Sequence, residues 1–287
     1  MPFFSIVIPT YNRAEIIGKT IQSVIDQNYT DWELIIVDDG GTDDTKTIVE
    51  QFNDKRIQYF WKKNEERGVA RNYGTQKVKG QYVFFLDSDD LIYPNHLQHA
   101  FDKLNDLHLP DFFHSRYEEV FPNKTVQVEK LNQAKILETI QKQNKMACQF
   151  FLRKDIALSI PFSENRNLKI GEDWLVILQV GLNYKLHISN TVNSAIVQHN
   201  NRSMQLANYN DVVRSRDLII EHLNNFSNTT QINKNVYFEL TSLSALSAVL
   251  NKDKLKGSKV LISLFLKYPV KVIKQRRTLA IVKHIFK

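Results

Sequence analysis

Two hydrophobic periods alternate through the first 120 residues of this chain, and this alternation is the strongest constraint on its fold. Short runs of β-branched and aromatic residues predict strands, and between them apolar residues at positions 16–25 and 45–52 recur at helical spacing. This pattern is typical of an α/β sheet built from crossover units. The expected strands are Phe3 to Ile8, Glu33 to Val37, Ile57 to Trp61 and Tyr82 to Leu86.

A polar loop follows three of these strands, at Pro9 to Asn12, Asp38 to Gly41 and Asp87 to Asp90. Parallel strands place their carboxyl ends at one edge of a sheet, and open α/β sheets bind ligands in the crevice outside those ends. We therefore expect the three loops to converge on one cleft.

The later sequence predicts fewer elements with clear limits. A polar stretch near positions 132–145 gives no assignment, and from Tyr209 onward the pattern is helical and increasingly basic. The expected elements are a helix from Pro94 to about Leu107, a strand around Asp111 to Tyr117, a strand at Cys148 to Leu152, a helix from Gly171 to about Leu182, and a strand leading to Gln198 to Asn200.

Three carboxylates end the fourth strand, where Asp87, Asp89 and Asp90 follow an apolar run. Like charges at this spacing cost free energy unless a cation offsets them, and carboxylate oxygens suit Mg²⁺ or Mn²⁺. Such an ion also binds a substrate's phosphates, so the run favours a divalent-metal site for a diphosphate-bearing substrate. A helix N-cap is the plainer alternative, because Asp and Ser are favoured there.

The loops after the first two strands could serve a nucleotide. Asp38 and Asp39 precede two glycines, which allow a tight turn and a close approach of the backbone to a ligand. One of these carboxylates could accept a hydrogen bond from a base or a ribose, and Tyr11 could stack on a nucleobase. Ordinary turn chemistry is the alternative for both loops.

These segments resemble the family-2 glycosyltransferases, whose nucleotide-sugar-binding fold is called GT-A. The resemblance is close from about residue 3 to residue 95, looser to about residue 200, and absent beyond about residue 215. It implies an α/β fold with a mixed, mainly parallel central sheet flanked by helices. The residues that carry it are Ile6 to Asn12, Ile36 to Gly40, Gly68 to Gly74, Phe85 to Asp90, and Glu172-Asp173.

The resemblance also implies a domain organisation. Residues 1–210 would form the catalytic domain, with a nucleotide-sugar-binding half at 1–95 and an acceptor-side half at 96–210. Residues 211–287 would form a helical C-terminal region with a basic tail.

The resemblance implies a role for each matching residue. Tyr11 would pack on uracil, Asp39 would bond the base, and Arg71 would contact the nucleotide. Asp87 would meet the ribose side, and Asp89 would hold a metal ion that stabilises the leaving nucleoside diphosphate. The implied donor-binding set is Pro9, Tyr11, Asp38, Asp39, Arg71, Asp87, Ser88 and Asp89, and the implied metal-binding set is Asp87, Asp89 and His199.

The family's general base falls on Asp173, at the start of a helix. There it would take the proton of an acceptor hydroxyl as that oxygen attacks the anomeric carbon, which is inverted in a single displacement. The helix N-terminus would favour the ionised carboxylate, although simple first-turn charge is the alternative reading of Glu172-Asp173. His199 resembles the family's late His near the metal or diphosphate, whereas a lone His is more often structural or on the surface.

Two departures from the family pattern bear on function. The Ser that usually follows Asp-Asp-Gly is Gly41 here, which removes a hydroxyl near the nucleotide. The Gln-x-x-Arg-Trp motif of processive polysaccharide synthases is missing. We therefore expect a single sugar to be added at each encounter.

The net charge of +7 is concentrated in the C-terminal tail. Ten Lys or Arg and no Asp or Glu lie between Lys254 and Lys287, while the body of the chain is slightly acidic. Apolar residues alternate with this charge and predict an interfacial helix after a break at Pro269, facing an anionic membrane surface. A solvated basic helix is the alternative, and no nucleic-acid partner is expected because no recognition motif accompanies the charge.

The sequence thus predicts a metal-dependent, inverting hexosyl- or N-acetylhexosaminyl-transferase. It would move a sugar from a nucleoside-diphosphate sugar, UDP-linked by expectation, to a glycan or lipid-linked acceptor in capsule, lipopolysaccharide or other surface polysaccharide synthesis. A sugar nucleotidyltransferase is one alternative, although Pro9 to Gly18 lacks the Gly-rich basic loop expected of it. A non-catalytic nucleotide-sugar-binding module is the other, and it would need no base at Asp173.

Cysteine content and hydropathy bear on location. A single cysteine, Cys148, excludes an intramolecular disulfide, and neither a leader-like segment nor an apolar run long enough to cross a bilayer is evident. We expect a cytoplasmic protein, peripheral on the inner face of the bacterial cytoplasmic membrane. The donated sugar, the acceptor hydroxyl, the choice of Mg²⁺ or Mn²⁺ and the oligomeric state do not follow from the sequence.

Overall fold

The computed structural model of the chain describes residues 1–168, 170–199, 202, 209–224, 230–250 and 252–286. The chain forms two compact units. The first comprises residues 1–137, 145–166 and 172–202, and the second comprises residues 138–144, 167–171 and 203–287. The division into a catalytic domain at 1–210 and a helical region at 211–287 stays a prediction, because compactness alone does not define a functional domain.

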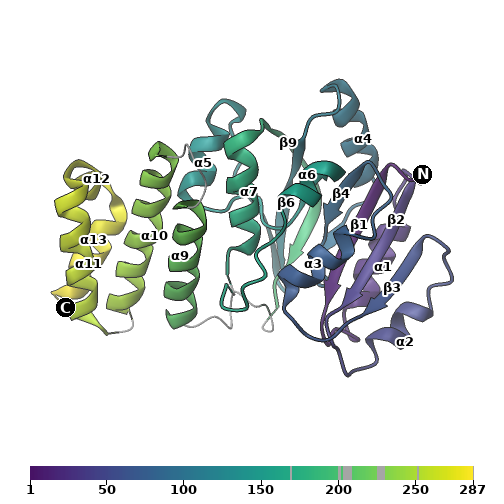
Figure 1. The fold of residues 1–287 in the computed structure, drawn as a ribbon, viewed down its shortest axis with the longest axis horizontal. Helices are drawn as coiled ribbons and strands as arrows, with labels where there is room; N and C mark the ends of the chain where they lie inside the picture. The colour runs from purple at the N-terminus through teal and green to yellow at the C-terminus, as the bar shows by residue number, and fades with distance from the viewer. Residues whose placement is uncertain (169, 200–201, 203–208, 225–229, 251, 287) are drawn as a thin grey trace. The chain divides into compact units, whose positions relative to one another are not determined.

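A nine-stranded mixed sheet forms the centre of the first unit (Figure 1), in the order β3-β2-β1-β4-β8-β6-β9-β5 with β7 paired to β6. Strands β1 to β4, β6 and β9 run in one direction, whereas β5, β7 and β8 run in the other. The mixed, mainly parallel sheet is therefore confirmed. The strands are β1 (Phe4–Thr10), β2 (Trp32–Asp38), β3 (Ile57–Trp61), β4 (Tyr82–Phe85), β5 (Leu91–Ile92), β6 (Phe112–Phe121), β7 (Lys124–Gln127), β8 (Phe150–Arg153) and β9 (Leu186–Val197).

The parallel strands β1 and β2 are buried at every position, as expected for strands covered by helices on both faces. Helix α1 (Ile17–Ile25) turns its apolar face, with Ile17, Ile21 and Val24, into the core of this sheet. Helix α4 (His96–Asp106) contributes to the same core, and α2 (Thr45–Glu50) follows β2. The four early strands, both early helices and the helix after Pro94 are confirmed.

Helix α3 (Arg67–Thr75) was not expected from the sequence, because glycine weakens a helical pattern. Its glycines allow close packing instead. A Cβ at Gly74 would lie 2.5 Å from Val7 Cγ1, and one at Gly68 would lie 2.5 Å from the Ser163 carbonyl oxygen. Only glycine lets α3 lie this close to β1 and to the segment around Ser163.

The later part of the first unit contains the predicted strands β6, β8 and β9 and the predicted helix α7 (Glu172–Asn183). Strands β5 and β7 and helix α6 (Lys154–Ser159) were not predicted. The unassigned polar stretch contains a 3-10 turn at Gln133–Lys135 and helix α5 (Ile136–Lys142). The register between β6 and β9 shifts on both sides of Arg116, which breaks the alternation that a sequence pattern relies on.

The second unit is helical, with α10, α11 and α13 side by side (Figure 1). A small apolar core joins Val249 of α10 to Ile281 of α13, and a Cβ at Gly257 of α11 would lie 2.3 Å from Val249 Cγ1. The Arg277 guanidinium donates to the carbonyl of Glu239 at 3.1 Å. The helices are α9 (Tyr209–Asn224), α10 (Thr230–Leu250), α11 (Lys254–Lys267), α12 (Pro269–Lys274) and α13 (Arg276–Ile285).

The sequence analysis expected one helix after Pro269, but the basic tail forms two short helices there. Pro269 does begin a new helix, but α12 ends at Lys274 and α13 starts at Arg276. Gln275 between them is extended, with φ −89° and ψ 126°. None of the helices described by the structure is long and apolar enough to cross a bilayer.

Candidate active site

The first two strand-end loops are tied together directly. The Thr42 backbone N–H donates to Asn12 Oδ1 at 2.8 Å, and the Asp39 N–H donates to the Thr10 carbonyl at 2.8 Å. Tyr11, which follows β1 and its Pro9, is 50% exposed and stands beside this junction. The aromatic ring predicted to stack on a base is therefore accessible to a ligand.

The two carboxylates after β2 are held by the protein in different ways. Asp38 accepts from the Gly41 N–H at 2.8 Å and from the Tyr59 hydroxyl at 2.5 Å, so both of its oxygens are engaged. Asp39 accepts through Oδ1 from Lys62 Nζ and from the Glu65 N–H, both at 2.9 Å. Oδ2 of Asp39 has a longer contact, 3.2 Å, to the Asn64 amide. The donor-binding roles of both residues stay predictions.

The third loop brings Asp87, Asp89 and Asp90 together, with one carboxylate oxygen of each within 4.8 Å of the others. The Thr20 hydroxyl of α1 donates to the Ser88 carbonyl at 3.0 Å and connects this loop to the helix. Ser88 itself is buried, so its predicted contact with the donor would come from the backbone.

Each carboxylate of this cluster has a different neighbour. Asp87 accepts from the Arg71 guanidinium at 2.7 Å. His199 Nε2 lies 2.9 Å from Asp89 Oδ2, which places the predicted late His beside the predicted metal ligand. Asp90 accepts from Arg202 at 2.7 Å. Asp87 is 26% exposed and Asp89 11%, whereas Asp90 is almost closed to solvent.

The electrostatics of the cluster fit a bound cation. Burial raises the pKa of Asp90 to about 8; the charges of Asp89 and Asp87 add to this effect, although Arg202 opposes it. Burial is the largest single influence on Asp87 and would raise its pKa, but the guanidinium groups of Arg71, Arg67 and Arg202 together hold that pKa below its usual value. Clustered oxygen ligands under mutual repulsion are what a hard divalent ion stabilises, and Asp87 and Asp89 are the members open enough to reach one.

The predicted base, Asp173, stands in the first turn of α7. Its Oδ1 accepts the backbone N–H of the next residue, Trp174, at 2.7 Å. Loss of hydration nevertheless raises the pKa of Asp173 to about 6, and the neighbouring Glu172 carboxylate adds to this rise. A carboxylate with this pKa is a better proton acceptor than a free one and is still largely ionised at pH 7.

Arg71 is 1% exposed, and its guanidinium lies between Asp87 and Glu172. The contact with a nucleotide that the sequence analysis gave to Arg71 is untested and stays a prediction. The geometry instead connects the donor-side carboxylate to the helix that carries Asp173.

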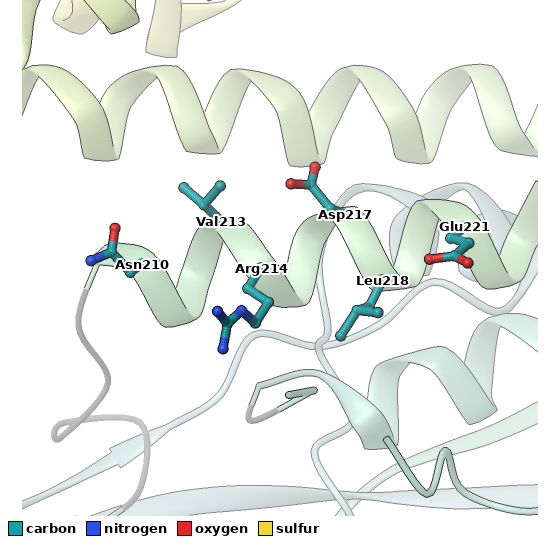
Figure 2. Close-up of a pocket in the computed structure, with 6 residues that line it drawn as sticks. All are labelled: Asn210, Val213, Arg214, Asp217, Leu218 and Glu221. Carbon is teal, nitrogen blue, oxygen red and sulfur yellow. The ribbon is translucent and has the colours of Figure 1, made fainter. Parts of the chain in front are cut away.

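Each unit has a groove lined by described residues. One, of about 440 Å³, is lined by residues of α9, where Arg214 and Leu218 project to one side of the helix and Val213 and Asp217 to the other (Figure 2). The other, of about 600 Å³, borders Asp38 at the edge of the sheet. Neither groove is lined by the three clustered carboxylates or by Asp173.

The sequence itself matches a known family. The model of glycosyl transferase family 2 matches residues 5–157, more than half of the chain. The chain belongs to glycosyl transferase family 2. The matched region contains the first two strand-end loops, the carboxylate cluster and Arg71, while Asp173 and His199 lie beyond it.

Two curated relatives illustrate the range of this family. An uncharacterised glycosyltransferase of Rickettsia typhi is 44% identical over 106 residues, which are 37% of this chain and 33% of that protein. A GalNAc(5)-diNAcBac-PP-undecaprenol β-1,3-glucosyltransferase of Campylobacter jejuni is 37% identical over 110 residues, which are 37% of this chain and 36% of that protein. The chain thus spans about a third of the length of these relatives.

Solved structures agree on the fold. The crystal structure of S. aureus TarS 1-349 in complex with UDP-GlcNAc superposes with a TM-score of 0.74 at 20% identity, covering 100% of this chain and 89% of that chain. At this identity the likeness establishes the fold alone. The family-2 chain therefore has the GT-A fold that the resemblance implied.

Sequence reasoning missed several partners of the site residues. Lys62 and Arg202 neutralise Asp39 and Asp90, and Arg67 pairs with Glu172. The i, i+4 spacing of Arg67 and Arg71 was the available signal, since it places both on one face of a helix. For Lys62 and Arg202 no local pattern marks a pairing over so many residues.

Proposed function

We propose that this family-2 chain is a metal-dependent, inverting glycosyltransferase that transfers one sugar from a nucleoside-diphosphate sugar to an acceptor hydroxyl. The observation that carries the proposal is the connected set of carboxylates, in which Asp87 and the start of α7 with Asp173 share one buried arginine. A donor site and a base held in one unit are what a single-displacement transfer requires.

The donor would lie against the strand-end loops. Tyr11 offers an exposed ring for the base, and Oδ2 of Asp39 is its less occupied carboxylate oxygen. One acceptor oxygen suits the single N3–H donor of uracil or thymine, which supports a UDP- or dTDP-linked donor. The TarS structure with UDP-GlcNAc supports the same class of ligand in this fold.

A divalent ion, Mg²⁺ or Mn²⁺, would be held by Asp87 and Asp89 with His199 alongside, and it would supply positive charge to the departing diphosphate. The chain's own part is the placement of these ligands. Arg71 and its neighbouring arginines keep Asp87 ionised, and Arg202 holds Asp90 in place beside the cluster.

Asp173 would take the proton of the acceptor hydroxyl as its oxygen attacks the anomeric carbon and the bond to the diphosphate breaks. The raised pKa of Asp173 matches this task, because the group must be ionised before the attack and must hold the proton after it. Attack from the face opposite the diphosphate inverts the anomeric carbon.

The experiment is a donor screen followed by transfer. Purified chain is incubated with UDP-, GDP- and dTDP-sugars, with Mn²⁺ or with EDTA, and the released nucleoside diphosphate is measured. Metal-dependent release of one nucleotide, lost in Asp89→Ala, supports the proposal. No binding of any nucleotide sugar in calorimetry on the same samples would favour a module without this activity.

The acceptor is proposed to be a lipid-linked glycan of a surface polysaccharide, met at an anionic membrane from the cytoplasmic side. Within the second unit, apolar side chains of α11 and α12 are exposed among lysines: Ile262 60%, Leu266 79%, Val270 61% and Ile273 69%. Exposed apolar residues interleaved with basic ones fit the boundary between headgroups and acyl chains. The lipid-linked substrate named for the Campylobacter relative supports the same acceptor class.

Liposome sedimentation tests the membrane proposal. The full chain should bind vesicles with anionic lipid and release them in high salt, while the double variant Leu266→Ser, Ile273→Ser should bind weakly. Neutral vesicles are the control. Equal binding of the full chain and the variant would count against this surface.

A further inference from the structure

Arg71 joins two carboxylates that lie on different elements of the first unit. One guanidinium nitrogen donates to Asp87 Oδ1 at 2.7 Å and the other donates to Glu172 Oε1 at 3.0 Å. The planar fork of arginine can hold two acceptors at a fixed angle, which the single point charge of lysine does not. Asp87 follows β4 and Glu172 begins α7, so the fork spans the donor side and the base side of the site.

A second arginine completes the arrangement. Arg67, one helical turn before Arg71 on α3, approaches Glu172 Oε1 at 2.8 Å. Glu172 is only 5% exposed and so receives two guanidinium groups in a nearly closed space. The Gly68 and Gly74 contacts hold α3 close to its neighbours, so both arginines extend from a rigid helix.

Stability alone gives a weak reason for such a cluster. Replacing a buried ion pair by packed apolar residues is often neutral or stabilising, because the desolvation of charges offsets their attraction. Here two guanidinium groups, those of Arg67 and Arg71, converge on Glu172, and Arg71 also pairs with Asp87. The arrangement therefore selects a geometry, and the groups at its ends are Asp87 and the turn that carries Asp173.

We propose that Arg71 and Glu172 are positioning residues that hold Asp87 and the first turn of α7 at a fixed distance and orientation. A donor bound at Asp87 and the base Asp173 are then placed correctly for the reaction. This inference rests on the proposed function. It gives Glu172, which touches neither donor nor acceptor in this scheme, a role separate from that of Asp173.

The charge of Glu172 also acts on its neighbour. The groups that influence Asp173 are Glu172 on α7, Arg71 on α3, and Asp87 after β4; Tyr117 of β6 and Cys148 before β8 are influenced by Asp173 in turn. Glu172 raises the pKa of Asp173 and Arg71 lowers it. Removing the negative charge at residue 172 should therefore lower the pKa of Asp173.

The test compares Glu172→Gln with the control Glu164→Gln in the full-length chain. Glu164 also accepts a hydrogen bond from α3, through Asn72 at 3.1 Å, but it is not among the groups around Asp173. Glutamine at residue 172 keeps an oxygen acceptor for both arginines and removes the charge. We expect Glu172→Gln to lower kcat about 10- to 100-fold, the usual cost of losing an outer-shell partner, with KM for the donor within about 3-fold.

Two further readouts separate positioning from folding. The acid limb of the kcat profile should move to lower pH in Glu172→Gln, and ¹³C-carboxyl NMR titration should report a lower pKa for Asp173, whether or not the substrates are identified. Arg71→Lys, which keeps the charge but not the fork, should also weaken metal-dependent UDP binding about 10-fold or more. Activity, pH profile and NMR pKa equal to those of Glu164→Gln would overturn the inference.

Failure of the proposed function has a different signature. In that case the wild-type chain neither binds nor turns over a nucleotide sugar, while the NMR titration still reports whether Glu172 controls Asp173. A wild-type chain that is active, together with an unmoved Asp173 pKa and unchanged kcat in Glu172→Gln, contradicts only the positioning roles.

Discussion

The central sheet has two parts, one around β1 and β2 and the other around β6, β8 and β9. These two sides of the sheet differ in how their buried polar groups are paired. On the side of β1 and β2, the Ser5 hydroxyl donates to Glu33 at 2.6 Å, and the N–H groups of Lys79 and Gly80 close the same network. On the side of β6, β8 and β9, several fully buried polar atoms have no hydrogen-bond partner among the described residues. These atoms are His114 Nε2, Ser115 Oγ, Arg116 Nε, Gln149 Nε2 and Asn193 Nδ2.

The contrast is one of degree, since Thr10 Oγ1, Trp32 Nε1 and Arg71 Nε are also unpaired on the first side. Its lesson is physical: paired buried groups rigidify a structure, whereas unpaired ones cost free energy. The part of the sheet around β1 and β2, whose loops are proposed to bind the donor, thus retains fewer unpaired buried polar atoms than the part around β6, β8 and β9.

The largest expected effect separates the two sides by function. Asp173→Asn removes the proton acceptor and leaves the donor loops untouched, so transfer should fall about 10²- to 10⁴-fold while UDP-sugar binding stays within about 3-fold. Steady-state kinetics and calorimetry measure the two quantities. A loss of donor binding equal to that of Asp89→Asn would show that Asp173 belongs to the donor side.

The pH dependence of transfer sharpens the same comparison. The pKa of Asp173 is raised to about 6, so the ionised base is present above that pH and is lost below it. We expect kcat to fall about 10-fold for each pH unit below 6, measured in a pH-rate profile. A rate that stays level down to pH 4.5 would argue against Asp173 as the base.

A third prediction concerns stability on the side of β8. His96 is buried and stacks on Phe151 at 5.4 Å, and among the described residues neither ring nitrogen makes a well-formed hydrogen bond. Burial lowers its pKa to about 3, while the unfolded chain takes up the proton near pH 6.5, so stability falls as the pH drops below 6.5.

Urea unfolding at pH 6.5 and pH 4.5 tests this prediction. Phenylalanine keeps the ring and has no proton to gain, so His96→Phe should lose about 2–3 kcal/mol less than the wild type between these two pH values. The same pH dependence in both proteins would refute the assignment.

The smallest effect is a matched pair of Ser→Ala variants, both at fully buried positions. Ser5→Ala leaves Glu33 and the Gly80 N–H short of a partner and should lower the free energy of unfolding by about 1–3 kcal/mol. Ser115→Ala removes an unpaired hydroxyl and should change it by less than about 0.5 kcal/mol, or raise it. If urea unfolding shows equal losses of unfolding free energy in both variants, the distinction between the two sides is wrong.

The same difference decides what the sequence could predict. Strands β1 and β2 are buried at every position, and their polar loops follow at once, so both the elements and their shared edge were evident. In β6 and β9 the register shifts around Arg116, and polar side chains such as His114 and Asn193 enter the core. No periodic pattern encodes such an arrangement.

The candidate site divides in a similar way. The carboxylate cluster was predictable because its three members are near neighbours in sequence, and His199 was found beside Asp89 as the resemblance implied. The partners of Arg71 were not predictable. They lie 16 and 101 residues away from Arg71 in the sequence. The glycines of α3 also weaken the sequence pattern by which this helix could have been predicted.

Metal-dependent binding of a nucleoside diphosphate tests the account most directly. Calorimetry would titrate UDP into the full-length chain with Mn²⁺, with Mg²⁺ and with EDTA, and into Asp89→Asn with Mn²⁺. We expect binding with the metal, and affinity at least about 100-fold weaker both in EDTA and in the variant. Equal binding with and without the metal, or no binding of UDP, GDP or dTDP under any condition, would contradict the donor site assigned to Asp87 and Asp89.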